Sequence, residues 1–245
     1  PDELIVELHL DPARKNQRLV EIAEESEKIG VHVAMSASEQ ITKLCGTDHH
    51  QGVCAKVMIP AIIDEAQFWV DYYPGWLEDQ RGNAYEEDCV SNEPLLLILD
   101  QVQDMHNLGA CLRSANAAGA TALVIPKHQS ASYSAQVAKA ASGATLETPI
   151  VEVNNLANFL RKLQKENFWL VGFSDEAEQD YLELDYQGPH ALIMGGEHAG
   201  ARRLTQEICD HLVSIPMQGC VGSLNVSVAA GVALFGVVGA RGGAN

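Results

Sequence analysis

Three segments of the sequence place polar or charged side chains beside glycines or at the start of a helix, where a small ligand can be held. The first covers residues 104–116, where an apolar run ends and an amphipathic helical pattern begins. Asn107 is expected at the N-cap of this helix. Arg113 and Asn116 are three residues apart and share a face. An arginine there can fork onto phosphate oxygens, although an exposed arginine on a solvated helix fits the same spacing.

The second segment, residues 193–204, runs from an apolar strand into a glycine-rich turn that contains Gly195, Gly196 and Glu197. Glycines allow a backbone to approach a ligand closely. The spacing differs from the G-x-G-x-x-G pattern and falls late in the domain, which argues against a nicotinamide cofactor. The segment therefore predicts either a ligand loop or a structural turn that leaves Glu197 in solvent.

The third segment, residues 215–229, is a glycine-containing loop that leads into an apolar helix. Ser223 or Asn225 can accept hydrogen bonds from the first N–H groups of that helix. Capping accounts for one of these two residues. A polar cluster beside glycines equally suits a loop that binds a ligand.

These segments need strands and helices to position them, and the hydrophobic pattern supplies both. From residue 95 onward, apolar runs alternate with helical patterns, which predicts an α/β domain whose mostly parallel sheet has helices on both faces. Strands are expected at residues 95–99, 121–125, 149–153, 169–173, 191–194 and 212–215. Residues 155–167 should form an amphipathic helix on the sheet. The last helix, residues 224–240, is apolar nearly all round and should be buried by the sheet, a second subunit or both.

Composition divides the chain into three parts. Residues 1–59 should form a small α/β domain, with strands at residues 4–10, 31–35 and 52–58 and helices at residues 16–29 and 38–44. Residues 60–92 are rich in acidic side chains and are expected to be an acidic linker whose aromatic residues pack in part on a neighbour. Residues 93–245 form the larger domain.

The overall charge excludes some classes of partner. The net charge of −17, from 16 basic and 33 acidic residues, argues against unspecific binding to nucleic acid or anionic membranes, so any contact with RNA must be local. No apolar run approaches the ~18 residues of a spanning helix, so no membrane partner is expected. The six cysteines lack a C-x-x-C pair, which favours reduced thiols in a cytoplasmic protein. The histidines lack the spacing of metal ligands, so no metal is expected.

In this order, the three segments resemble the motifs of the SpoU/TrmH (SPOUT) family of RNA ribose 2′-O-methyltransferases, and the likeness covers nearly the whole chain. Within the family, the chain is most similar to enzymes that methylate a guanosine ribose in the peptidyl-transferase P loop of 23S rRNA. The resemblance implies S-adenosylmethionine as cofactor, a homodimer, and a deep trefoil knot formed by the segments around Glu197 and Ser223. It also implies that residues 1–59 are a ribosomal-protein-like domain that binds RNA.

The resemblance carries the family's functional positions onto this chain. The catalytic set falls on Asn107, Arg113, Glu197, Ser223 and Asn225. The cofactor contacts fall on Gly195, Gly196, Ile215, Met217, Ser223 and Leu224. Family accounts treat the arginine as the base. Because a guanidinium with a pKa above ~12 is almost never neutral, Arg113 can instead clamp the target phosphate, with Asn107 and Glu197 orienting it.

The expected substrate is 23S rRNA or a large-subunit assembly intermediate. Candidate RNA contacts are Arg14, Lys15 and Arg18 in the first domain, with Arg113 and Arg202 in the second, although solvated surface charges fit each position. Two other functions stay open. One is a tRNA ribose 2′-O-methyltransferase, which only the first domain distinguishes, and the other is a catalytically inactive RNA-binding module of the same fold.

Overall fold

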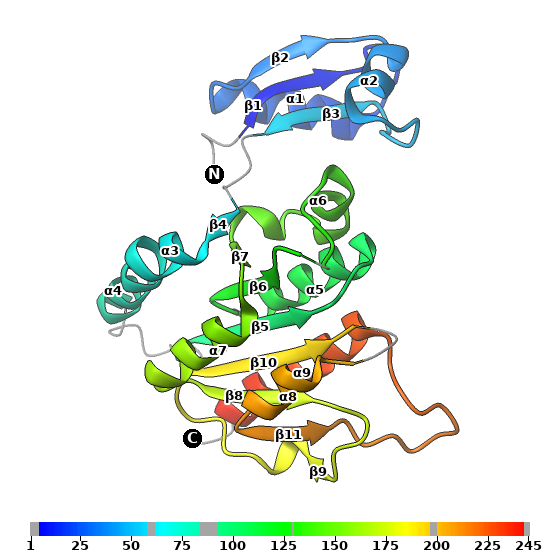
Figure 1. The fold of residues 1–245 in the computed structure, drawn as a ribbon. Helices are drawn as coiled ribbons and strands as arrows, with labels where there is room; N and C mark the ends of the chain where they lie inside the picture. Colours follow the sequence, from blue (N-terminus) through cyan, green and yellow to red (C-terminus); the bar gives the residue numbers. More distant parts are fainter. Residues whose placement is uncertain (1–4, 58–61, 84–92, 129, 197–199, 243–245) are drawn as a thin grey trace. The chain divides into compact units, whose positions relative to one another are not determined.

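The computed structural model describes residues 5–57, 62–83, 93–128, 130–196 and 200–242. The chain forms two compact units, Pro1–Pro60 and Ala61–Asn245, each of which is described by itself (Figure 1). In the described part of the chain, no helix has both the length and the apolar character needed to cross a membrane.

The first unit is a small three-stranded sheet with two helices. Its elements are β1 (Ile5–Leu10), α1 (Gln17–Lys28), β2 (His32–Met35), α2 (Ser38–Cys45) and β3 (Val53–Val57). The strand order is β2-β1-β3, with β2 parallel and β3 antiparallel to β1. Leu8 and Leu10 pack against Leu19 of α1. Asn16 caps α1 by accepting a hydrogen bond from the Arg18 N–H at 3.0 Å.

The second unit is built on one eight-stranded sheet in which every strand pair is parallel. The strand order is β4-β7-β6-β5-β10-β8-β11-β9. The strands are β4 (Ile63–Asp64), β5 (Leu95–Asp100), β6 (Ala122–Pro126), β7 (Ile150–Val153), β8 (Trp169–Phe173), β9 (Gln179–Asp180), β10 (His190–Gly195) and β11 (His211–Ser214). The six strands expected from the apolar runs are confirmed. The short edge strands β4 and β9 were not expected, since two residues carry no periodicity.

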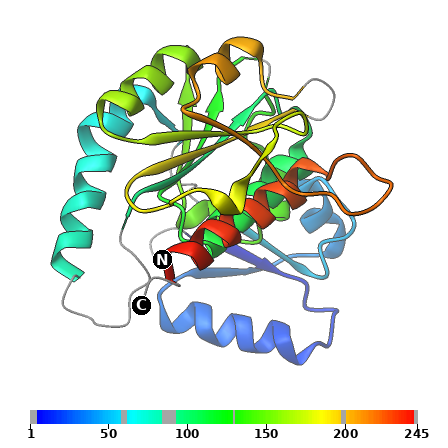
Figure 2. The same ribbon diagram turned by 90° about the horizontal axis from the view of Figure 1, so that it is seen from below.

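Helices cover both faces of this sheet (Figures 1 and 2). They are α3 (Glu65–Gln67), the π-helical η1 (Phe68–Tyr72), α4 (Tyr73–Asn83), α5 (Met105–Ala117), α6 (Ala135–Ala141), α7 (Leu156–Lys165), α8 (Arg203–Ile208) and α9 (Val226–Gly242), with 3₁₀ turns η2 (Ala144–Leu146) and η3 (Tyr181–Glu183). Successive residues of β5 enter opposite cores because side chains alternate along a strand. Leu97 packs with α5, α6 and α9, whereas Ile98 packs with α7 and the η1 aromatics.

The structure corrects the expectation that residues 60–92 form a linker, because residues 62–83 belong to the second unit. Strand β4 pairs with β7 in the large sheet. Phe68 is 0% exposed and packs on Phe159 of α7, with ring centroids 5.8 Å apart. Acidic side chains such as Asp71 lie on the exposed side of the same segment. The aromatic residues of this segment pack on a neighbour, as expected. The acidic composition concealed only the pairing of β4 with the large sheet. Residues 58–61 and 84–92 lie outside the described residues.

Helix α9 crosses one face of the sheet and is held at its C-terminal end by a buried arginine. Arg241, 8% exposed, donates hydrogen bonds to the carbonyl oxygens of Tyr186 at 3.0 Å, Glu93 at 3.0 Å and Gly188 at 2.7 Å. Ala230, Leu234 and Val237 of α9 are buried. The helix is thus buried on one face in this structure, whereas burial on several sides was expected. The threading of a knot stays a prediction, because residues 197–199 lie outside the described residues.

Candidate active site

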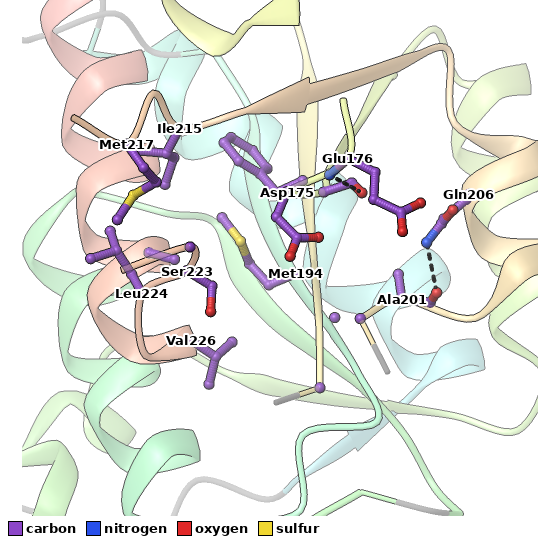
Figure 3. Close-up of a pocket in the computed structure, with 17 residues that line it drawn as sticks. Asp175, Glu176, Met194, Ala201, Gln206, Ile215, Met217, Ser223, Leu224 and Val226 are labelled. Atoms are coloured by element: carbon purple, nitrogen blue, oxygen red, sulfur yellow. Dashed lines mark hydrogen bonds between the residues drawn. The ribbon is translucent and has the colours of Figure 1, made fainter. Parts of the chain in front are cut away.

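A cavity of about 390 Å³ lies where the carboxyl ends of three neighbouring strands, β10, β8 and β11, meet (Figure 3). Ligands of open α/β sheets bind at this edge, outside the carboxyl ends of the strands. All six positions expected to contact a cofactor line the cavity, namely Gly195, Gly196, Ile215, Met217, Ser223 and Leu224. The two glycine-containing segments therefore meet at one place, although about twenty residues separate them.

Gly195 and Gly196, in the turn after β10, leave no room for a side chain. A Cβ on Gly195 would collide with the backbone of Gly200 and Ala201, and one on Gly196 would collide with the carbonyl group of Gln101. Gly196 and Gly200 also exchange two backbone hydrogen bonds, at 3.2 and 3.0 Å. The absence of side chains at these two positions allows the tight packing of the turn, and both glycines line the cavity with main chain. Glu197, expected to be catalytic, lies outside the described residues.

The turn is anchored by a buried carboxylate that no sequence motif indicated. Asp100, 0% exposed at the end of β5, accepts hydrogen bonds from the Arg202 N–H at 2.9 Å and the Thr205 hydroxyl at 2.7 Å. The Arg202 guanidinium lies 2.7 Å from the other carboxylate oxygen. Arg202, expected to contact RNA, is thus the partner of a buried charge in this structure, and a contact of Arg202 with RNA stays a prediction.

The first and third segments are joined by two asparagines. The Asn225 Nδ2 donates to the Asn107 Oδ1 at 3.1 Å. The Asn225 Oδ1 accepts from the Ser227 N–H at 2.9 Å, which caps the start of α9. Of the two expected caps for this helix, Asn225 is therefore the one observed.

The structure corrects the position of Asn107. The N-cap of α5 is Asp104, whose carboxylate accepts from the N–H groups of His106 at 2.7 Å and Asn107 at 2.9 Å. The helix thus begins at Met105, two residues before Asn107. Both Asp and Asn are favoured caps, so composition alone could not choose between them. Asn107 instead lies in the first turn, where its side chain reaches Asn225.

Arg113 is exposed on α5 and is not among the described residues that line the cavity. Its Nη1 donates to the Ser142 hydroxyl at 3.3 Å. Ser142 ends α6 with a φ of 52°, a left-handed conformation that serine rarely adopts. Asn116 donates to the Thr148 hydroxyl at 3.0 Å, so both residues reach the segment after α6. Six residues of helix, about 9 Å, separate Arg113 from Asn107.

Two cysteines on the elements around the site are poor nucleophiles at neutral pH. Burial raises the pKa of the Cys111 thiol to about 12. The pKa of Cys209 is also raised to about 12, chiefly by burial and further by the carboxylates of Asp210 and Asp100. Because the thiolate is the reactive form, covalent catalysis by these thiols is disfavoured. No three or more His, Cys, Asp or Glu side chains converge on a metal position in the described ranges.

The RNA-contact candidates of the first unit are exposed. Arg14, Lys15 and Arg18 all lie at the surface, in the turn before α1 and its first residues. Nearby, His50 is buried and accepts a hydrogen bond from the Gly52 N–H at 2.9 Å. Gly52 adopts a φ of 88°. This part of the first unit is therefore a structured turn, with basic side chains beside it.

Comparison with known proteins assigns the family. The model of the SpoU rRNA methylase family matches residues 94–235, and the model of the RNA 2′-O ribose methyltransferase substrate-binding domain matches residues 1–61. The chain belongs to the SpoU rRNA methylase family.

Individual relatives agree over nearly the whole chain. The 23S rRNA (guanosine-2′-O-)-methyltransferase RlmB of Ralstonia nicotianae is 44% identical over 96% of this chain and 87% of the relative. RlmB of Xanthomonas campestris is 45% identical over 97% of this chain and 90% of the relative. Among solved structures, the SpoU methyltransferase AviRb from Streptomyces viridochromogenes, in complex with the cofactor AdoMet, has a TM-score of 0.73 at 23% identity and covers 96% of this chain and 82% of that chain.

The cavity suits the family's cofactor, S-adenosylmethionine. Its volume lies within the usual range of small-molecule pockets, ~300–1,000 Å³. Apolar side chains such as Met194, Ile215 and Leu224 can cover an adenine ring, and the main chain at Gly195 can contact polar atoms. The charged side chains among the described lining residues, Asp175 and Glu176, are both acidic, which suits a cationic ligand.

Four residues of the site were not expected from the sequence. They are Asp100, Asp175, Glu176 and Gln206, of which the last three line the cavity. One signal was present, because Asp100 and the pair Asp175–Glu176 each follow an apolar strand closely. Polar residues at the carboxyl ends of parallel strands mark the ligand-binding edge of such a sheet. Hydrophobic patterns do not reveal the order of the strands in the sheet. Without that order, these residues could not be placed at one site.

Proposed function

We propose that this protein transfers a methyl group from S-adenosylmethionine to the ribose 2′-oxygen of a guanosine in the peptidyl-transferase P loop of 23S rRNA. The observation that carries the proposal is the glycine-lined cavity beside the Asn107–Asn225 hydrogen bond. This site belongs to a chain that is 44–45% identical to the two RlmB relatives over nearly its whole length.

The proposed cofactor site is formed by the two loops that meet at the cavity. Gly195 and Gly196 offer main-chain contacts from one side, and Ile215 and Leu224 offer apolar contacts from the other. Met217 and Ser223 complete the proposed set. When bound, the cofactor supplies a methyl group on a positively charged sulfur, which is electrophilic without help from the protein.

The protein's own part is to align the ribose hydroxyl and manage its proton. In the proposed reaction the new bond joins the methyl carbon to the 2′-oxygen, the bond from that carbon to sulfur breaks, and the hydroxyl proton leaves. Arg113, exposed on α5, would clamp the adjacent phosphate with its forked guanidinium. Asn107, which lies about 9 Å along α5 from Arg113, and Glu197 would orient the ribose. Phosphate or water would take the proton, because a guanidinium stays charged at neutral pH.

Substrate RNA would be bound in part by the first unit. This unit matches the family's substrate-binding model, and Arg14, Lys15 and Arg18 are exposed there. With a net charge of −17, attraction to RNA must come from such local groups. A substrate such as rRNA or a large-subunit assembly intermediate favours a cytoplasmic location. Free cysteines such as Cys45 and Cys111 favour the same location.

We further propose that two copies of the chain associate through α9. Its outward face carries Val228, Val232 and Phe235, which are 51%, 38% and 53% exposed. Their i, i+4, i+7 spacing forms one apolar stripe. Analytical ultracentrifugation should show a dimer for the wild type and a monomer for Phe235→Glu. A wild-type monomer at micromolar concentration would exclude this association.

The test of the methyl-transfer proposal is transfer of labelled methyl groups from S-adenosylmethionine to separate 23S rRNA and tRNA pools that lack 2′-O-methylation. Label on 23S rRNA alone is expected. Label on tRNA alone would show that the protein is a tRNA methyltransferase. Cofactor binding without transfer to either pool, repeated with 50S assembly intermediates, would favour an inactive RNA-binding module.

A further inference from the structure

The loop after β8 lines the cofactor cavity and has no part in the mechanism described above. Strand β8 lies between β10 and β11 in the sheet, with Gly172 beside Ile193 and Phe173 beside Val213. The residues that follow β8 therefore emerge between the glycine turn and the loop after β11. Ser174, Asp175 and Glu176 all line the cavity.

The two carboxylates of this loop have different surroundings. Figure 3 shows the Asp175 carboxylate pointing into the cavity beside Met194, whereas Glu176 points toward Gln206. No lysine, arginine or histidine occurs among the described residues that line the cavity. The field that these side chains create inside the cavity is thus negative.

Charge distinguishes the two forms of the family's cofactor. The methyl donor, S-adenosylmethionine, carries a sulfonium cation, and the demethylated product, S-adenosylhomocysteine, carries a neutral thioether. The two molecules share the adenine, the ribose and the amino-acid portion. A negative side chain in the cavity therefore attracts the donor more than the product, while apolar and main-chain contacts treat both alike.

We propose that Asp175 is a specificity-determining residue that favours the sulfonium-bearing donor over the demethylated product. This inference rests on the proposed function, because it assumes that the cavity binds S-adenosylmethionine. Methyl transfer removes the positive charge, so the attraction of Asp175 for the ligand falls once the reaction is complete. The same carboxylate thus helps to load the donor and to release the product.

Isothermal titration of the full-length protein with three ligands tests the proposal. They are S-adenosylmethionine, S-adenosylhomocysteine and sinefungin, in which an amine-bearing carbon replaces the methylsulfonium. Asp175→Asn keeps the shape and hydrogen-bonding oxygen of the side chain and removes its charge. Because Asp175 is exposed, the effect should be modest, with about three- to ten-fold weaker binding of the two cationic ligands. The affinity for S-adenosylhomocysteine should stay unchanged.

Glu178→Gln is the matched control, because Glu178 is exposed on the same segment and does not line the cavity. It removes the same unit of net charge and should alter none of the three affinities. Equal weakening of donor and product in Asp175→Asn would overturn the proposal, since it would assign Asp175 to the shared part of the ligand. Unchanged donor binding would overturn it as well. A wild-type protein that binds neither donor nor product would instead refute the cofactor assignment.

Discussion

Asn225, at the start of α9, donates a hydrogen bond to Asn107 in the first turn of α5, across 118 positions of sequence. The same Asn225 side chain caps α9 through its oxygen, which accepts from the Ser227 N–H. Because the cap occupies the oxygen, the amide nitrogen must face Asn107. The Asn225 amide thus links α9, which follows the cofactor loop, to α5, which carries Arg113.

Substitution of Asn225 should separate its two roles. Serine is also a favoured N-cap but is too short to reach Asn107, so Asn225→Ser should keep the free energy of unfolding within about 0.5 kcal/mol of the wild type. Methyl transfer should nevertheless fall at least about ten-fold, as for the loss of one well-placed hydrogen bond in a transition state. Asn225→Ala should lose in addition about 1 kcal/mol of stability with the cap. Single-turnover kinetics and urea unfolding measure the two effects. Full activity of Asn225→Ser would show that the link to Asn107 has no catalytic role.

Arg113→Lys tests whether the guanidinium acts as a fork. Lysine keeps the positive charge but cannot make two parallel hydrogen bonds to a phosphate. Turnover on RNA should therefore fall at least about ten-fold, and the affinity for S-adenosylmethionine should not change, because Arg113 does not line the described cavity. Steady-state kinetics on RNA and titration with the cofactor give the two values. Near-normal turnover of the lysine variant would count against the clamp.

Two glycines of the cavity should respond differently to the same change. A Cβ at Gly195 collides with the backbone of Gly200 and Ala201, so Gly195→Ala should reduce cofactor affinity by at least about ten-fold or destabilise the unit. Gly222 also lines the cavity, but its Cβ would meet no atom within 4 Å. Gly222→Ala should therefore bind the cofactor as the wild type does. Equal affinities for both variants would show that the turn after β10 is not rigid.

Removal of basic charge from the first unit should reduce both RNA affinity and its salt dependence. In the variant with Arg14, Lys15 and Arg18 all changed to Gln, each lost phosphate contact should reduce the slope of log affinity against log salt by about 0.7–0.9. The matched control is Lys28→Gln, at the opposite end of α1. An unchanged slope in the triple variant would remove this cluster from the RNA interface.

His190 should make the second unit less stable at mildly acidic pH. It is 2% exposed, and its Nδ1–H donates to the Gly188 carbonyl oxygen at 2.9 Å. Burial lowers the pKa of His190 below its ordinary value of 6.5. His190 of the unfolded chain therefore binds a proton below about pH 6.5, while the imidazole of the folded state stays neutral until the pH reaches its lower pKa. The free energy of unfolding consequently falls as the pH falls toward that folded-state pKa.

Urea unfolding at neutral and mildly acidic pH, compared between the wild type and His190→Gln, isolates this contribution. The wild type should lose more stability on acidification than the variant does, because glutamine does not titrate. Parallel losses in the two proteins would show that His190 is not the group responsible.

Local pattern predicted much of the fold, because a parallel strand buried on both faces is a continuous apolar run. The strand at residues 95–99 and the helix at residues 155–167 are examples. Phe68 was assigned to a linker because its exposed acidic neighbours dominate the composition of the segment. The cap at Asp104 was missed because two favoured cap residues lie three positions apart.

The site could be predicted only in part, since it depends on contacts between distant segments. The resemblance placed Gly195 and Ser223 in a shared site, and the structure brings both to one cavity. The pairing of Asn107 with Asn225 and the burial of Asp100 against Arg202 depend on strand order and on how α9 crosses the sheet. Neither follows from hydrophobic periodicity, which shows only which residues share a face of one helix or strand.

Mass-spectrometric mapping of methyl groups on 23S rRNA, after incubation with the wild-type protein and S-adenosylmethionine, is the decisive test of the proposed reaction. One added methyl group is expected on the ribose of a guanosine in the peptidyl-transferase P loop, and it should appear at least about ten-fold more slowly with Arg113→Lys. Methylation of a base, or of a ribose elsewhere in 23S rRNA, would contradict the proposed reaction.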